Sequence, residues 1–137
     1  MLTGLEAFKN FAPVLLRVVT GVIFVVHGYG KLFGGMEQFT GYVTQSLHLP
    51  AFLAWGAAGI EFFGGTALVL GLLTRLSALG IAAVMAVAVS KVHWAAGLTA
   101  DGGYEYPLVL LCVAVSLMLT GGGPLSFDRL FIEKKSS

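Results

Sequence analysis

Residues 59–80 read GIEFFGGTALVLGLLTRLSALG, and this stretch decides the fold. It places one carboxylate, Glu61, inside a long apolar run that stops near Gly71 and resumes directly after Arg75. Two apolar runs separated by a few turn-forming residues predict two helices joined by a tight antiparallel turn. We expect Gly71 to break the first helix and Thr74 to cap the second.

Apolar runs of this kind account for nearly the whole chain of 137 residues. The sequence predicts helices over about 11–33, 51–73, 76–97 and 104–121, each near the ~20 residues that cross a ~30 Å hydrocarbon layer. Hydrophobic residues make up 57% of the chain and charged residues 11%, whereas soluble domains are about 25% charged. The sequence therefore predicts an all-α membrane protein: one antiparallel bundle of four transmembrane helices over 1–137, with a short segment over 122–137 after the last helix.

The basic residues are divided unevenly between the two sides of the predicted bundle. With four helices, both termini and the turn between the second and third helices share one side. That side carries six basic residues and the other side two: Lys9, Arg17, Arg75, Arg129, Lys134 and Lys135 against Lys31 and Lys91. By the positive-inside rule, this asymmetry predicts that both termini are cytoplasmic.

The connections on the opposite, outer side are longer. The first, over 34–50, is amphipathic enough to form a short surface helix near 36–47. The second spans 97–107 and is rich in glycine and aromatic residues, as interfacial loops often are. After the last helix, we expect Ser126 to be the N-cap of a short further helix.

Ionisable residues gather in the outer half of the predicted bundle. All four helices contribute to this cluster, which comprises His27, Lys31, Glu61, Lys91, His93 and Glu105. At ~1.5 Å per residue, Glu61 lies about 15 Å from either surface. The inner half holds only Arg17, which we expect to snorkel to the headgroups. Because a charge facing lipid at a helix centre costs ~2.5–3.5 kcal/mol, we expect the outer cluster to face the bundle interior.

Small residues share helix faces with these charges. One stripe of the first helix carries Arg17, Gly21, Phe24, Gly28 and Lys31, and one stripe of the second carries Ala54, Ala57, Glu61, Gly64, Gly65 and Leu68. Stripes of small residues let helices approach closely in lipid. In the third helix, Lys91 and His93 differ by about 200° of rotation, so both cannot point at the bundle axis.

Each of these ionisable residues could have a purely structural role instead of a functional one. Glu61 is either a proton-exchanging acid or a structural carboxylate paired with Lys31, Lys91 or Arg17. His27 and His93 are either ligand-binding residues or interfacial histidines satisfied by backbone or water. A haem or metal site could be drawn from the histidines and glutamates, but the HxxE or ExxH spacing of helical metal sites does not recur, and we predict no metal site.

Other classes of function are set aside by composition. A net charge of +1 and the lack of a basic patch interleaved with aromatic residues argue against a nucleic-acid partner. Cys112 is the one cysteine, so no internal disulfide or CxxC redox pair can form.

Five stretches recur in a recognisable order and spacing: LLRVVTGVIFVVHGYGKLFGG (15–35), GIEFFGGTALVLGLLTRLSALG (59–80), VHWAAG (92–97), GGYEYPLVLLC (102–112) and GGGPLSFDRL (121–130). Together they resemble the DoxX family of small four-helix bacterial membrane proteins. The resemblance implies a multi-pass protein of the bacterial inner (plasma) membrane, associated with quinone-linked oxidation or with complexes that handle oxidative stress. By matched position, the family-type residues would be Arg17, His27, Lys31, Glu61, Arg75 and Glu105.

The residues and the resemblance together predict a quinone-associated accessory or subunit of a membrane redox complex. Glu61 and Glu105 are assigned the catalytic role of proton exchange. The cofactor-binding residues are assigned as Arg17, His27, Lys31, Lys91 and His93, of which Lys31, Lys91 and His27 would donate hydrogen bonds to quinone carbonyl oxygens. Electrons would come from a redox partner protein, because the chain has no Rossmann-type glycine fingerprint.

Two alternatives belong to other classes of function. In the first, the polar cluster only locks the helices of a membrane assembly module, with association of several copies through the glycine faces left open. In the second, the cluster is the relay of a small-solute or proton carrier, although the chain shows neither an inverted repeat nor a broken helix.

Overall fold

The computed structural model describes residues 2–131, and these form helices and short connections with no strand among them. Three helical stretches are long and apolar enough to cross a membrane: Gly4–Ser46, Ala51–Leu70 and Thr74–Ala96. A further apolar helix, Glu105–Thr120, is shorter. The predicted all-α membrane fold is therefore confirmed. The later stretches begin and end within a few residues of the predicted 51–73, 76–97 and 104–121, whereas the first continues past residue 33 to Ser46.

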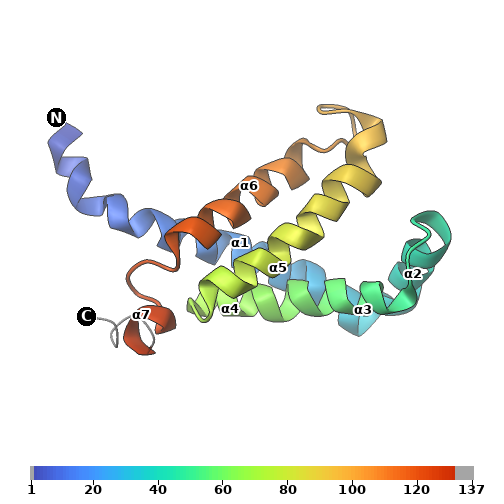
Figure 1. Ribbon diagram of the computed structural model, residues 1–137, viewed down its shortest axis with the longest axis horizontal. Helices are drawn as coiled ribbons and strands as arrows, with labels where there is room; N and C mark the ends of the chain where they lie inside the picture. The colour runs from blue at the N-terminus through green and yellow to red at the C-terminus, as the bar shows by residue number, and fades with distance from the viewer. Residues whose placement is uncertain (1, 132–137) are drawn as a thin grey trace.

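The first helical stretch bends sharply near its end. Residues Leu2–Phe11 form a 3₁₀ segment that leads into α1 (Ala12–Gly30), whose first turn contains Pro13, a residue favoured there because its missing N–H is not needed. A π-helical turn, Lys31–Gly35, carries the chain into α2 (Met36–Gly41), which is followed by a second π-helical turn, Tyr42–Ser46. Figure 1 shows α2 turned away from the axis of α1. The surface helix predicted near 36–47 is thus present.

The second and third helical stretches also contain π-helical turns. The second stretch consists of α3 (Ala51–Gly59), a π-helical turn (Ile60–Gly64) and α4 (Gly65–Leu70). The third consists of α5 (Thr74–Val87), a π-helical turn (Ala88–His93) and a 3₁₀ turn (Trp94–Ala96). The chain then forms α6 (Glu105–Thr120) and the short α7 (Phe127–Phe131).

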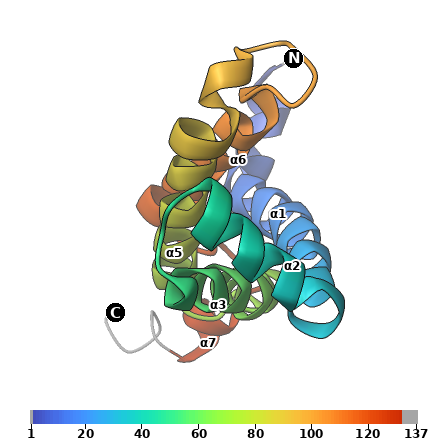
Figure 2. The same ribbon diagram turned by 90° about the vertical axis from the view of Figure 1, so that its right-hand side faces the viewer.

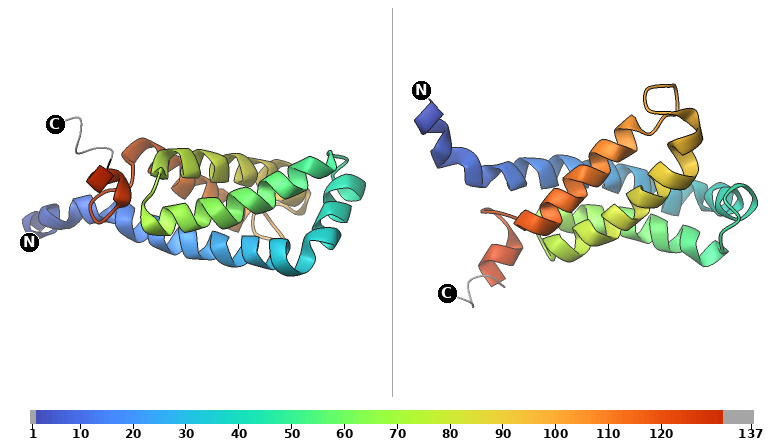
Figure 3. Two further views of the ribbon diagram at one scale, coloured as in Figure 1. Left: turned by 90° about the horizontal axis from the view of Figure 1, so that it is seen from below. Right: turned by 45° about the horizontal axis from the view of Figure 1, so that its top comes forward.

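The helices pack as two pairs that meet at one end of the bundle. α1 lies along α4, and α5 lies along α6. α5 contacts α4 and the turn Ile60–Gly64, but α3 and the later part of α5 diverge (Figures 1 and 3). The N-terminal segment and α7 lie at what we call the terminal end; α2 and the connection 97–104 lie at the opposite, loop end (Figures 1 and 2). The divergence of the pairs opens the bundle towards the loop end.

Glycine allows the first pair of helices to touch through their backbones. A Cβ atom on Gly21 would lie 2.6 Å from the carbonyl oxygen of Gly65, and one on Gly65 would lie 2.8 Å from that of Gly21. A Cβ atom on Gly28 would likewise overlap the backbone of Phe62. The predicted stripe of the first helix is confirmed, since Arg17, Gly21, Phe24 and Gly28 are all buried.

Arg17 does not snorkel to the headgroups as predicted. Its side chain is buried, with 1% of the residue exposed. The guanidinium donates hydrogen bonds to the carbonyl oxygens of Leu68 and Val69 at 3.0 and 2.8 Å, of Gly122 at 2.9 Å, and of Leu125. The last carbonyls of a helix have no partner within it. Arg17 supplies that partner for α4 and fastens the segment after α6 to the same place, which explains its burial.

Asp128 caps α5 from the far end of the chain. Its carboxylate accepts hydrogen bonds from the backbone N–H groups of Leu73 and Thr74, the latter at 2.7 Å. Thr74 was predicted to be the cap, and this prediction is wrong, because its own hydroxyl has no hydrogen-bond partner. Gly71 does break the preceding helix, in the left-handed conformation at φ 69°.

Ser126 caps α7, as predicted. Its hydroxyl accepts a hydrogen bond from the backbone N–H of Arg129 at 3.3 Å and donates one to the carbonyl oxygen of Gly123 at 2.7 Å. Together with the Arg17 and Asp128 contacts, these bonds fix the segment 121–128 against the turn between α4 and α5.

Candidate functional site

A cavity of about 880 Å³ lies between the diverging helix pairs at the loop end. Its walls come from α1, α2 and the turn after it, α3, α5, the connection 97–104 and the start of α6. The lining is mainly apolar, with residues such as Phe24, Val43, Ile60, Met85 and Leu110. Volumes of ~300–1,000 Å³ with a few convergent polar groups are typical of sites for small organic ligands.

Five of the seven predicted site residues line this cavity. They are His27, Lys31, Glu61, His93 and Glu105. Arg17 does not line it and instead holds backbone carbonyls at the terminal end. Lys91 is exposed and also absent from the lining. The question left open for the third helix is therefore answered in favour of His93.

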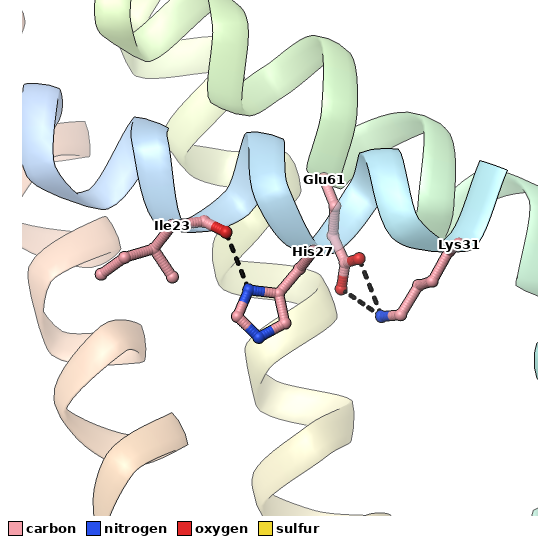
Figure 4. Close-up of polar contacts among 4 residues, drawn as sticks. All are labelled: Ile23, His27, Lys31 and Glu61. Atoms are coloured by element: carbon pink, nitrogen blue, oxygen red, sulfur yellow. Dashed lines mark hydrogen bonds and ion pairs between the residues drawn. The ribbon is translucent and has the colours of Figure 1, made fainter. Parts of the chain in front are cut away.

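Glu61 and Lys31 form an ion pair in the cavity wall. The ammonium Nζ atom of Lys31 lies 2.8 Å from both carboxylate oxygens of Glu61 (Figure 4). The Glu61 side chain is 4% exposed and the Lys31 side chain 28%. The same ammonium lies 4.4 Å from the centre of the Phe39 ring, a cation–π contact. Of the three partners considered for Glu61, Lys31 is thus the one that the fold supplies.

His27 lies one helical turn before Lys31. Its Nδ1 atom is 2.7 Å from the backbone carbonyl oxygen of Ile23. A carbonyl oxygen can only accept, so Nδ1 carries a proton and donates. Figure 4 shows the other ring nitrogen, Nε2, directed away from α1. Nε2 is therefore the nitrogen that His27 offers to a ligand.

His93 repeats this arrangement on the opposite wall. Its Nδ1 atom is 2.7 Å from the carbonyl oxygen of Gly102, so it donates in the same way. That bond ties the end of the third helical stretch to the connection before α6. Glu105 opens α6 beside it and is exposed, as suits a carboxylate at a helix N-terminus.

The π-helical turns coincide with the cavity. Lys31, Glu61 and His93 each lie in a different π-helical turn, and a fourth contributes Tyr42 and Val43 to the lining. Such turns are rare in proteins overall, and those that do occur are often found at functional sites. Sequence reasoning missed them, because a π-helical turn leaves no composition signal that distinguishes it from an α-helix.

Other lining residues were also missed at the sequence level. Tyr42, Thr99, Asp101 and Tyr106 bring further oxygen atoms to the cavity. Asp101 and Thr99 belong to a loop whose path could not be read from periodicity. Among the described residues, no three His, Cys, Asp or Glu side chains lie close enough together to hold a metal ion.

The cavity has exposed apolar residues on its α3 and α5 walls. Five lining residues there are apolar and exposed: Leu53, Gly56, Ile60, Ala83 and Val87. Ile60 packs close to Gly80, where the two helices still approach one another. Beyond that contact the two helices diverge (Figure 1).

The fold and cavity define a class: a small helical membrane protein with a mainly apolar cavity, carrying a few ionisable side chains, between its own helices. The chain belongs to the DoxX family, whose model matches residues 12–94, more than half of the chain.

Three relatives align along almost the whole length of both chains. The chain is 37% identical over 134 residues to the Bacillus subtilis (strain 168) protein named "Putative oxidoreductase CatD", covering 94% of this chain and 95% of the relative. It is 26% identical over 143 residues to the Escherichia coli (strain K12) "Inner membrane protein YqjF", covering 95% and 99%. An uncharacterized Haemophilus influenzae protein is 28% identical over 138 residues, covering 97% and 100%. No solved structure matches the chain.

Proposed function

We propose that the chain is a quinone-associated accessory or subunit of a redox complex in the bacterial inner membrane. The observation that carries this proposal is the mainly apolar cavity, of a size suited to a substituted quinone ring, on which five ionisable side chains converge. The Bacillus subtilis relative is named an oxidoreductase and the Escherichia coli relative an inner membrane protein, which supports the same direction.

Four helices cross the membrane in this proposal, with both termini in the cytoplasm. The 16 residues of α6 extend about 24 Å, short of a ~30 Å hydrocarbon layer, and local thinning of the bilayer accommodates such a span at modest cost. Because Arg17 is buried, it is no longer counted among the basic residues that determine orientation by the positive-inside rule. Lys9, Arg75, Arg129, Lys134 and Lys135 still outnumber Lys31 and Lys91, and of these Lys134 and Lys135 lie outside the described residues.

We assign ligand binding and proton exchange to different side chains according to their positions in the cavity. The Lys31–Glu61 pair forms the deep polar wall, and His27 and His93 offer ring nitrogens to the ligand. Glu105, exposed at the start of α6, exchanges protons with the aqueous surface, and Glu61 exchanges them at the inner wall. Electrons pass to or from a partner protein, because the chain carries no motif for a flavin or nicotinamide.

Lys31→Gln is expected to weaken quinone binding at least about tenfold, because it leaves the buried Glu61 carboxylate unpaired and changes the charge of the cavity wall. Lys91→Gln is the matched control, since Lys91 is exposed and outside the lining. Binding is measured by titrating the purified protein in lipid nanodiscs with duroquinone (tetramethylbenzoquinone). Equal affinity in all three proteins would contradict the assigned site, and no binding to the wild type would contradict the proposed function.

Gly56→Trp is expected to close the opening that we propose for ligand entry between α3 and α5. Gly56 lines the cavity and a side chain there meets nothing within 4 Å, so the indole can fold across the opening without disturbing the helices. We expect a quinone with a long isoprenoid tail to lose about tenfold or more in affinity. Gly59→Trp is the control, because Gly59 has similar free space on the same helix but does not line the cavity. An unchanged affinity in Gly56→Trp would mean that the ligand enters elsewhere.

Lys31 bonds both carboxylate oxygens of Glu61, so the pair needs no ligand to satisfy the buried charge. This favours a second candidate, an assembly module in which the pair only fixes helix register. Thermal unfolding in detergent distinguishes the two. In the assembly module, Glu61→Gln lowers the unfolding temperature and wild-type protein binds no quinone. In the proposed redox role, wild-type protein binds quinone and is stabilised by it.

A further inference from the structure

We propose that the cavity prefers the hydroxyl-bearing, reduced form of its ring ligand to the carbonyl-bearing, oxidised form, with His27 and His93 as the residues that set this preference. The inference rests on the proposed function and adds to it the redox state that the site recognises. It follows from counting which polar atoms of the lining can donate a hydrogen bond and which can only accept one.

Both histidines line the cavity, and each uses its Nδ1 atom within the protein. In each ring, Nδ1 donates to a backbone carbonyl oxygen, that of Ile23 for His27 and that of Gly102 for His93. The neutral imidazole has one N–H, so Nε2 carries a lone pair and accepts. Backbone carbonyls of a helix turn and of a short loop thus fix both rings in the same tautomer. A ligand meeting Nε2 must bring the hydrogen itself.

The donors nearest to these rings are already engaged. Lys31 has three N–H groups, and its ammonium bridges both oxygens of Glu61 while lying over the ring of Phe39. Glu61 therefore takes two of these N–H groups, which leaves at most one for a carbonyl oxygen of a ligand. The two bonds to the carboxylate are charge-assisted and stronger than a bond to a neutral carbonyl.

The rim of the cavity adds two carboxylate acceptors. Glu105 and Asp101 contribute carboxylates, which accept only when ionised. The backbone N–H groups of Gly103, Tyr104 and Glu105 donate within the loop, to the carbonyl oxygens of Ala100, Gly97 and Leu98. The hydroxyls of Tyr42, Thr99 and Tyr106 can act in either sense and therefore favour neither redox form.

An uncharged donor fits this lining better than a cation does. The deep wall is the Lys31–Glu61 pair, whose charges cancel, and His27 and His93 also line the space. The carboxylates of Asp101 and Glu105 lie at the rim, so an ammonium group at this charge-balanced deep wall would be buried without a counter-charge beside it. An aromatic ring with two hydroxyl groups brings two hydrogens and no charge.

This inference revises the hydrogen bonds predicted from the sequence. There, Lys31, Lys91 and His27 were assigned as donors to quinone carbonyl oxygens. In the structure, Lys31 is held by Glu61, Lys91 lies outside the lining, and His27 presents an acceptor. Most of the residues selected from sequence line the cavity, but the inferred sense of their hydrogen bonds is the reverse of the one predicted.

The test compares duroquinone with durohydroquinone, which share one shape and differ in having two carbonyl or two hydroxyl groups. Both are titrated anaerobically into purified full-length protein in lipid nanodiscs. We expect durohydroquinone to bind at least about tenfold more tightly, because each hydroxyl meets an acceptor while each carbonyl faces a lone pair. The dimethyl ether of durohydroquinone, which has oxygens but no donor, should bind as weakly as the quinone.

Variants of the histidines connect this preference to its source. Gln offers both a donor and an acceptor, so His27→Gln and His93→Gln are each expected to reduce the ratio of the two affinities severalfold by tightening quinone binding. His48→Gln is the control, because His48 is exposed and outside the lining. A change in stability alone would weaken both ligands together and leave the ratio unchanged.

The outcomes separate the two proposals. If neither duroquinone nor durohydroquinone binds, the proposed function fails. If both bind with equal affinity, or duroquinone binds more tightly, the function stands and the inferred preference is overturned. A wild-type preference for durohydroquinone that persists unchanged in both histidine variants overturns the assignment of His27 and His93.

Discussion

Gly21→Val is expected to prevent the bundle from assembling. The added Cβ would lie 2.6 Å from the carbonyl oxygen of Gly65 and 2.9 Å from the backbone nitrogen of Val69. These are backbone atoms, so no side-chain rotation relieves the overlap, and α1 must move away from α4. We expect a loss of stability above the ~1–3 kcal/mol of ordinary overpacking. Thermal unfolding in detergent and the yield of monodisperse protein measure it.

Gly30→Val is the control for this prediction. Gly30 lies on the same helix, and a side chain there meets nothing within 4 Å. It introduces the same β-branched residue and the same change in helix propensity without a clash. Similar unfolding temperatures for the two variants would show that α1 and α4 do not depend on backbone contact at Gly21.

Arg17→Gln is expected to destabilise the terminal end by about 3–5 kcal/mol. The guanidinium is buried and serves four carbonyl oxygens from two segments far apart in the sequence, and a glutamine amide has too few donors to replace it. Arg17→Lys should recover only part of the loss, because an ammonium lacks the planar fork of the guanidinium. Unfolding in detergent and proteolysis after residue 120 both report on this end.

Arg75→Gln is the matched control. Arg75 also donates to helix-terminal carbonyls, those of Met118 and Leu119, at 3.0 and 3.1 Å, but it is exposed. Water can replace an exposed donor, so we expect less than about 1 kcal/mol of destabilisation. An Arg17→Gln protein as stable as Arg75→Gln would contradict the structural role of the buried guanidinium.

Much of the fold follows from local pattern. The apolar runs locate the helices, Gly71 marks the turn, and the spacing of Gly21, Phe24 and Gly28 identifies the buried face of α1. Such features depend on helix geometry and on the cost of burying charge in lipid, which act within a few residues. They could therefore be read from the sequence alone.

What could not be read depends on tertiary placement. The hydrogen-bond acceptors of Arg17 include Gly122, 105 positions away, so its burial has no local signal. The choice of Lys31 rather than Lys91 as the partner of Glu61 is set by rotation of whole helices within the bundle. The cavity exists because α3 and α5 diverge, and the sense of its hydrogen bonds follows from the carbonyls that orient His27 and His93.

The segment 121–128 has a consequence for biosynthesis. Arg17 leaves the ribosome 105 residues before its acceptor Gly122, and its acceptor Leu125 and the α5 cap Asp128 follow later still. Throughout translation, a nascent chain holding its apolar helices in the membrane therefore carries an incompletely bonded guanidinium and an uncapped α5. Emergence of residues 121–128, and not insertion of α6, is the event that closes this end of the protein.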